Sequence, residues 1–169
     1  IMEAVKFDHL TLPESVEKPW ALGGAEGRSR NIVKSFYNEK GALERFNEHL
    51  QDKYARIEAE EVRFEQIGPP EPEGLIVAFG TAARICKEAV RQAPERTGKQ
   101  VGLLRPISLW PFPTDAIRRL AEQVQWILVV EMNTGQMVED VRLAVEGRCS
   151  VLFHGRPGGA VPCTADIFD

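Results

Sequence analysis

The sequence predicts an α/β fold over residues 74–169, with three α/β/α layers and a mostly parallel sheet. Short, uninterrupted apolar runs in this region are typical of strands buried on both faces. Segments of helical periodicity lie between these runs, so that strands and helices alternate along the chain. This alternation favours right-handed βαβ units, which build a parallel sheet with helices on both faces. The predicted strands are 75–79, 101–104, 127–130 and 150–153, and the predicted helices are 82–93, 114–124 and 134–146.

Residues 38–73 predict a long helix followed by a linker. Asn38 is the expected N-cap, and the helix is expected to end near Glu61. Apolar residues recur every seven positions and form one stripe on an otherwise charged helix. Two interpretations stay open, because the stripe can pack on the chain's own sheet and arm or dock on a partner subunit. The alternating run 62–66 predicts a short edge strand, and the proline-rich run 68–74 predicts a boundary. The stripe comprises Leu43, Phe46, Leu50, Tyr54, Ile57 and Phe64.

Residues 1–37 predict an extended N-terminal arm, since glycines and prolines recur there without periodicity. Its apolar side chains indicate that the arm lies against something rather than being simply disordered. These side chains are Phe7, Leu10, Leu12, Trp20 and Leu22. The opening Ile1-Met2 and the final residues 164–169 suggest a fragment of a longer polypeptide.

Composition and charge argue against several kinds of partner and binding site. A net charge of -4 gives no electrostatic reason to expect nucleic acid or an anionic membrane as partner. No apolar run approaches the roughly 20 residues that span a bilayer, and no signal-peptide pattern opens the chain. The three cysteines, Cys86, Cys149 and Cys163, lack metal-ligand spacing, so no metal site is expected. Such sparse cysteines suit a reducing environment, which predicts a cytoplasmic protein.

Ligands of open α/β sheets collect at the carboxyl ends of the strands, where this sequence places three loops. In the first loop, Gly80 and Thr81 precede a helix whose free N–H groups can hold an anion. A tight structural turn is the favoured interpretation there, because no glycine-rich phosphate motif accompanies the pair. The second loop, 105–113, is stiffened by prolines and carries Arg105, Trp110 and Phe112. Its aromatic residues either anchor an interface or fold back on the domain.

The third loop, 131–136, concentrates polar groups at a strand end. Its candidate residues are Glu131, Asn133, Thr134 and Gln136. Either Asn133 or Thr134 caps the following helix, or these groups face the ligand of a neighbouring domain. Glu131 has no second titratable group nearby in sequence for acid–base chemistry.

Elsewhere in the chain, no pattern assigns catalysis. Arg156 follows the last strand within a glycine-rich run, where a turn is favoured over a phosphate site. His9, His49 and His154 have no metal-ligand spacing, and no nucleophile–base arrangement is evident. The residues therefore predict no catalytic set, and the chain is not expected to catalyse a reaction alone.

Several motifs occur in a fixed order over residues 74–163. Together they resemble the second domain of α subunits of 2-oxoacid:ferredoxin oxidoreductases. The resemblance implies a fold like the transketolase C-terminal domain. Met137, the run 138–142 and the Gly-Arg-Pro-Gly-Gly turn resemble the 2-oxoisovalerate type more than the 2-oxoglutarate type. The motifs are 75–84, 101–106, 109–113, 130–137 and 155–159.

The resemblance also implies an activity, cofactors and partners. Enzymes of this family oxidatively decarboxylate 2-oxoacids to acyl-coenzyme A and pass electrons through iron–sulfur clusters to ferredoxin. Thiamine diphosphate with Mg, the clusters and coenzyme A are expected in the parent complex, with none of them on this chain. The expected partners are a thiamine-binding β subunit and γ and ferredoxin-like subunits. A stand-alone α/β ligand-binding domain is the alternative from a different class.

Overall fold

The computed structural model describes residues 18, 21, 24, 26–30 and 32–168 of the chain. Most of the arm expected over 1–37 lies outside these residues, including its five apolar side chains. The described residues of the arm form no helix or strand. The chain divides into two compact units, which meet between Asp52 and Lys53.

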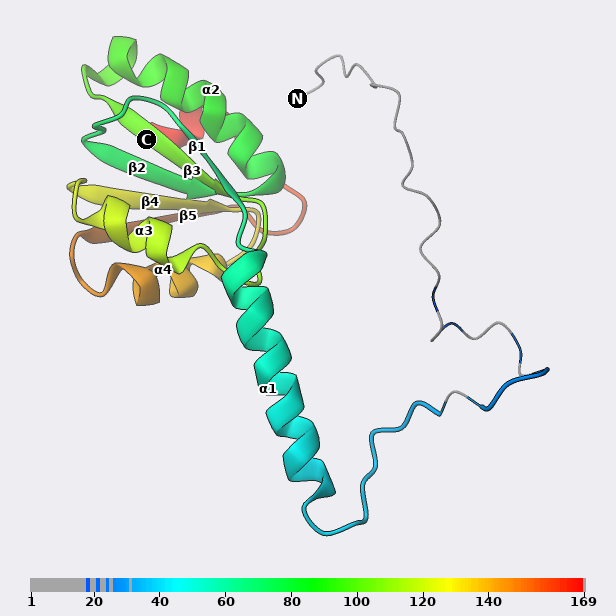
Figure 1. Ribbon diagram of the computed structural model, residues 1–169. Helices are drawn as coiled ribbons and strands as arrows, with labels where there is room; N and C mark the ends of the chain where they lie inside the picture. The colour runs from blue at the N-terminus through cyan, green and yellow to red at the C-terminus, as the bar shows by residue number, and fades with distance from the viewer. Residues whose placement is uncertain (1–17, 19–20, 22–23, 25, 31, 169) are drawn as a thin grey trace. The chain divides into compact units, whose positions relative to one another are not determined.

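A five-stranded sheet forms the centre of the second unit (Figure 1). Its order is β1-β3-β2-β4-β5, in which β1 runs antiparallel to β3 and the other neighbours are parallel. The predicted mostly parallel sheet and the predicted edge strand, β1, are therefore confirmed. The strands are β1 (Phe64–Ile67), β2 (Gly74–Ala78), β3 (Val101–Pro106), β4 (Trp126–Glu131) and β5 (Ser150–Gly155).

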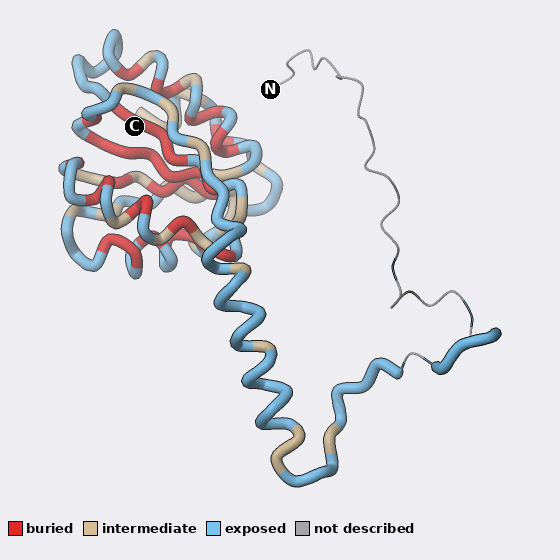
Figure 2. The backbone as a smooth tube through the Cα atoms, in the orientation of Figure 1, coloured by how far each residue is buried: buried red, intermediate tan, exposed pale blue. Residues whose placement is uncertain are grey.

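Helices cover both faces of this sheet, as the alternating pattern predicts. One apolar cluster joins α2 (Gly80–Thr97) to one face, and a second joins α3 (Thr114–Ala121) and α4 (Met137–Val145) to the other. Figure 2 shows the buried backbone concentrated in the central strands and in the helices beside them. Strand β2 is buried at every position, because it has a strand on each side and helices on both faces.

The long helix α1 spans Ala42–Glu60, so a helix ending near Glu61 is confirmed. It begins later than expected, and the N-cap prediction for Asn38 is wrong. Gly41 has a φ of 77°, a left-handed conformation that cannot continue a right-handed helix, so the first turn starts after it. Phe64, assigned to the helical stripe, belongs instead to β1.

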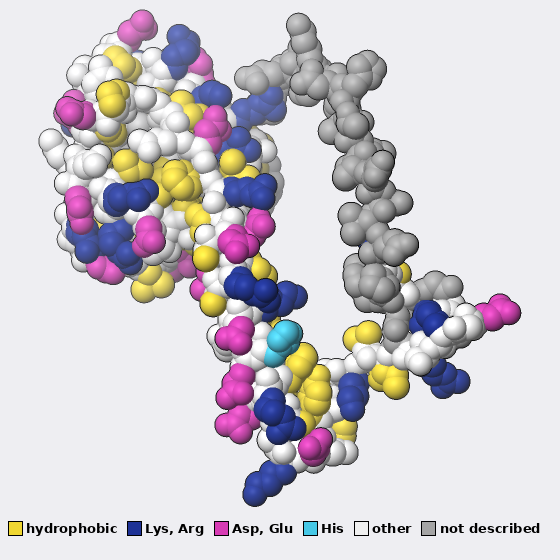
Figure 3. All heavy atoms as spheres, in the orientation of Figure 1, with side chains coloured by type: hydrophobic (Ala, Val, Ile, Leu, Met, Phe, Trp, Pro, Cys, Tyr) yellow, Lys and Arg dark blue, Asp and Glu magenta, His cyan; other side chains and the backbone are white. Residues whose placement is uncertain are grey.

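The apolar stripe of α1 lies on an exposed helix. No residue of this helix is buried by the described part of the chain, and Figure 3 shows hydrophobic side chains exposed along it among charged ones. Phe46 stacks on Tyr37 of the arm with ring centroids 4.9 Å apart. Tyr54 meets Trp110 edge-on at 5.6 Å. Within the described residues, side chains of the stripe thus make two aromatic contacts, one with the arm and one with the 105–113 loop.

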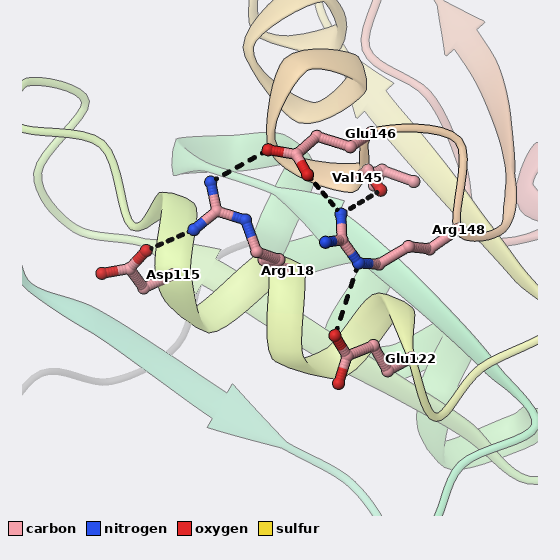
Figure 4. Close-up of polar contacts among 6 residues, drawn as sticks. All are labelled: Asp115, Arg118, Glu122, Val145, Glu146 and Arg148. Carbon is pink, nitrogen blue, oxygen red and sulfur yellow. Dashed lines mark hydrogen bonds and ion pairs between the residues drawn. The ribbon is translucent and has the colours of Figure 1, made fainter.

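An ion-pair network fastens α3 to the end of α4 (Figure 4). Arg118 contacts Asp115 at 2.8 Å and Glu146 at 3.3 Å. Arg148 contacts the same Glu146 at 2.7 Å and reaches Glu122 at 3.3 Å. The hydrogen bond from Arg148 is the main reason that the pKa of Glu146 is lowered. These ion pairs join α3 and the residue after it to the segment that follows α4.

Candidate functional site

The carboxyl end of β4 carries the polar loop that the sequence singles out. Glu131 is the last residue of this strand, and α4 begins at Met137. Side chains alternate along a strand, so Glu131 lies on the same face as Ile127 and Val129, which pack against α3 and α4. Glu131 is only 1% exposed, and no other charged side chain of the described residues is buried.

Four N–H donors surround the Glu131 carboxylate. The backbone amides of Met137 and Val138 each donate to it at 3.0 Å, and that of Gln136 donates at 3.3 Å. The side-chain amide of Asn133 donates to the same carboxylate at 2.9 Å. The first amides of a helix have no intrahelical acceptor, so Glu131 caps α4 from outside the helix. Its negative charge also lies at the positive end of the helix dipole.

The loop between β4 and α4 is held by Asn133. Its side-chain oxygen accepts a hydrogen bond from the Gly135 amide at 2.7 Å, closing a local turn. Gly135 itself has a φ of 112°, which only glycine adopts easily. On the other side, a Cβ atom at Gly155 would lie 2.4 Å from the carbonyl oxygen of Asn133. Glycine is therefore required at the end of β5 so that this loop can approach it.

These contacts correct one of the two interpretations of the loop. Neither Asn133 nor Thr134 caps α4, because the helix begins later and its terminal amides bind Glu131. The sequence signal for this cap is a glutamate at a strand end, ahead of a helix that lacks a capping residue of its own. Glu131 accordingly acts as a structural carboxylate whose lone pairs are engaged.

A pocket of about 210 Å³ opens beside this loop at the carboxyl end of the sheet. Glu131 forms part of its wall, and the exposed Asp140 adds a second carboxylate. Among the residues that the structure describes, no basic side chain lines this pocket. The remaining walls are largely apolar, and Phe79, Leu109 and Asp140 are residues that the sequence analysis missed. The lining is Phe79, Leu109, Phe112, Glu131, Gln136, Met137 and Asp140.

The other candidate residues are distributed over different surfaces. Phe112 packs partly against the core and joins the pocket beside Glu131, whereas Trp110 is 55% exposed. Thr81 is exposed in the first turn of α2, and Thr134 is exposed in the loop. Arg105 lies on β3, where its guanidinium contacts Glu65 of β1 at 3.0 Å. The structure thus brings together Phe112, Glu131, Asn133 and Gln136, but neither Thr81 nor Arg105.

Trp110 belongs to a second, larger hollow of about 620 Å³ within the same unit. The hollow lies between the end of α1, strand β1 and the start of α3. Its lining includes the apolar side chains of Val62 and Phe64 and the charged side chains of Glu58 and Arg119. The peptide bond between Trp110 and Pro111 is cis in this loop. The 105–113 loop therefore contributes both aromatic residues to this hollow, and Phe112 also lines the pocket beside Glu131.

The glycine-rich run after β5 forms a turn, as favoured. Strand β5 ends at Gly155, and the Arg156 guanidinium donates to Asp166 at 2.8 Å. The pKa of Asp166 is lowered chiefly by the backbone amide of Cys163, which donates to the same oxygen at 2.7 Å. Arg156 is thus engaged with the C-terminal segment.

The described residues contain neither a candidate metal cluster nor a helix that could span a membrane. They hold no group of three or more histidine, cysteine, aspartate or glutamate side chains that could bind a metal ion. Burial raises the pKa of the Cys86 thiol to about 12, as expected for a cysteine that packs as a small apolar residue. No helix in this part of the chain has the length and apolar character to cross a membrane.

Two solved structures resemble this chain in fold. A 2-oxoglutarate:ferredoxin oxidoreductase from Magnetococcus marinus, solved with 2-oxoglutarate, coenzyme A and succinyl-CoA bound, matches 78% of this chain and 23% of its own chain. The TM-score is 0.66 at 19% identity, which establishes likeness of fold. A split-gene transketolase, described as an inactive β4 tetramer, matches 62% of this chain and 38% of its own with a TM-score of 0.53 at 17% identity. The α/β unit therefore has a transketolase C-terminal-like fold.

The family model for pyruvate:ferredoxin oxidoreductase core domain II matches residues 73–167. The chain belongs to this family. Among curated proteins, ketoisovalerate oxidoreductase subunit VorB of Methanothermobacter thermautotrophicus is 39% identical over 167 residues, covering 99% of this chain and 47% of the relative. 2-Oxoglutarate synthase subunit KorA of Archaeoglobus fulgidus is 34% identical over 145 residues, covering 82% and 40%. The chain spans about half the length of the curated relatives it matches.

Proposed function

We propose that this chain is the C-terminal domain of the α subunit of a thiamine-diphosphate-dependent 2-oxoacid:ferredoxin oxidoreductase. In that role it supports the oxidative decarboxylation of a 2-oxoacid to acyl-coenzyme A within a complex of several subunits. Its own part is that of a scaffold and interface domain. The membership of the core domain II family carries this proposal.

The 2-oxoisovalerate type is the substrate class that we favour. The match to the ketoisovalerate oxidoreductase subunit extends over 99% of this chain, so it includes the arm and α1 as well as the α/β unit. The match to the 2-oxoglutarate synthase subunit is shorter, at 82% of the chain, and lower in identity. The sequence motifs after Gln136 favour the same type. A 2-oxoglutarate substrate is the second candidate, supported by that shorter match.

The strand-end pocket and the cysteines of this chain do not suit the cofactors of the proposed complex. The pocket at the strand ends presents Glu131 and Asp140 without a basic residue, which would repel a diphosphate. The Glu131 carboxylate is already engaged by four donors. Three separated cysteines cannot supply the four thiolates that an iron–sulfur cluster takes. Thiamine diphosphate with Mg, the clusters and coenzyme A are therefore proposed to bind elsewhere in the complex.

The role proposed for the loop between β4 and α4 is to present a rigid contact surface. The cap made by Glu131 and the turn made by Asn133 fix the loop, and Thr134 and Gln136 are left exposed upon it. Trp110 offers a further exposed aromatic surface on the neighbouring loop. Rigid loops with exposed aromatic and amide groups suit contact with the thiamine-binding β subunit and with the γ and ferredoxin-like subunits.

The test is purification of the complex through a tag on the natural full-length gene product that contains this chain. We expect recovery of a thiamine-binding subunit with an iron–sulfur partner, and reduction of a viologen dye with 2-oxoisovalerate and coenzyme A. A preference for 2-oxoglutarate would replace the favoured substrate class by the second one. Recovery of the tagged protein without such subunits would overturn the proposal and favour a stand-alone ligand-binding domain.

A further inference from the structure

The two edges of the sheet differ in how they are protected. Edge strands expose unpaired backbone groups, which soluble proteins usually guard with charges, prolines or bulges. β1 carries Glu65, whose ion pair with Arg105 lies across that edge pair. β5 reads Ser-Val-Leu-Phe-His-Gly, without a Lys, Arg, Asp, Glu or Pro. Within the described part of the chain no strand pairs with the outer side of β5.

Apolar side chains flank this unguarded edge on both faces of the sheet. Leu152 is 52% exposed and Phe153 is 37% exposed. Consecutive strand residues point to opposite faces, so neither face of the edge is polar at its centre. An exposed apolar edge of this kind is the usual template for pairing with another strand.

The direction of the outer backbone groups follows from one hydrogen bond at the end of β5. The Arg156 amide donates to the carbonyl of Glu131 on β4 at 3.1 Å. Backbone groups point alternately to the two sides of a strand, so those of Leu152 and His154 also face β4. Those of Val151, Phe153 and Gly155 therefore point outward, away from the sheet.

We propose that β5 pairs antiparallel with β5 of a second copy of this chain, with Phe153 opposite its own counterpart. A two-fold axis through this position pairs all three outward-facing residues, because Val151 then lies opposite Gly155. It also places Leu152 opposite His154 on the other face. If the two-fold axis passed through Leu152 instead, fewer outward-facing backbone groups of β5 would form hydrogen bonds between the copies. Arg148 of one copy would also lie opposite Arg156 of the other. The register centred on Phe153 avoids that like-charge contact, and the resulting sheet continues through both copies.

Sedimentation velocity of the 169-residue chain, from micromolar to millimolar concentration, tests this pairing. We expect a reversible monomer–dimer equilibrium. Leu152→Lys places a charge at the edge without disturbing a buried position, and it is expected to weaken association by at least about tenfold. Ile107→Lys is the matched control, since Ile107 is 53% exposed and its amide donates to the carbonyl of Arg63 next to β1, at the opposite edge of the sheet.

Amide hydrogen exchange then distinguishes edge pairing from other association. The Phe153 amide is expected to exchange more slowly as the concentration rises, whereas the Leu152 amide, which faces β4, is expected to stay unchanged. A chain that remains monomeric at millimolar concentration would overturn the proposal. An equal loss of association in the two lysine variants would also overturn it. So would a Phe153 amide whose exchange rate does not change with protein concentration. The result does not depend on the proposed enzymatic role, because it concerns this strand alone.

Discussion

Glu131 shows how a charged residue is accommodated in an apolar core. An isolated ionised carboxylate is very costly to bury, and this one lies among aliphatic side chains of β4, α3 and α4. Three backbone amides and the Asn133 side chain supply the hydrogen bonds that water would otherwise provide. The carboxylate in turn satisfies amides that the helix itself cannot pair. The charge and the helix terminus thus stabilise each other.

Glu131→Gln is expected to destabilise the fold by roughly 2 kcal/mol, because an amide NH₂ would then face N–H donors in a buried site. The measurement is urea unfolding of the 169-residue chain, followed by circular dichroism. Glu139→Gln is the control, since Glu139 is exposed in the first turn of the same helix and pairs only with Arg142. Equal losses in the two variants would contradict the capping role of Glu131.

At the residue scale the sequence predicts which loop matters, but not what each residue does. Polar side chains at a strand end predict the site, and hydrogen bonds to the Glu131 carboxylate do bring Asn133 and Gln136 to it. The cap could not be assigned, because it depends on a carboxylate five to seven positions ahead of the amides that it binds. The need for glycine at 155 arises from a close approach between segments distant in sequence.

The pairing of β2 with β4 depends on a glycine at the first position of β2. Gly74 is the register partner of Trp126, and a Cβ atom on Gly74 would lie 2.1 Å from the nearest carbon of the indole ring. The ring therefore lies directly over the glycine. A larger residue at position 74 would therefore have to displace the indole ring from the start of β4.

Gly74→Ala is expected to lower the free energy of unfolding by about 1–3 kcal/mol, because the added methyl group must displace the indole. Gly102→Ala provides the comparison, since its Cβ would meet Pro72 at 3.2 Å and a small shift would relieve it. Thermal and urea unfolding of both variants give the measurement. A loss at Gly102 as large as that at Gly74 would argue against the indole contact as the cause.

Elements buried on both faces are those that the sequence predicts best. The apolar runs of β2, β3 and β4 predict these strands closely, because their composition directly reflects burial. Helix starts are less predictable, since Gly41 delays α1 and Glu131 shifts the start of α4 to Met137. Periodicity describes a helix face but does not say what covers it, and the stripe of α1 is largely exposed.

At the scale of the whole molecule, alternation of strands and helices predicts the sheet, but it does not predict which exposed surfaces are interfaces. The alternating run ahead of the proline-rich boundary predicts an edge strand, and the structure adds that β1 runs antiparallel to β3. Composition alone does not show which exposed surface is an interface, because Trp110 and Leu152 are both exposed apolar side chains. Only their placement on a loop and on an edge strand separates the two surfaces.

A chain that supplies surfaces rather than a catalytic set should be inactive by itself. The 169-residue chain spans about half the length of its relatives, and its strand-end pocket offers two carboxylates and no cation. We therefore expect the purified chain, checked by circular dichroism to be folded, to give no 2-oxoacid-dependent reduction of a viologen dye in the presence of thiamine diphosphate, Mg²⁺ and coenzyme A. The complete complex assayed alongside is the positive control. Turnover by the isolated chain would refute the scaffold role, because the chemistry would then have to arise from residues such as Glu131 that already serve as structural caps.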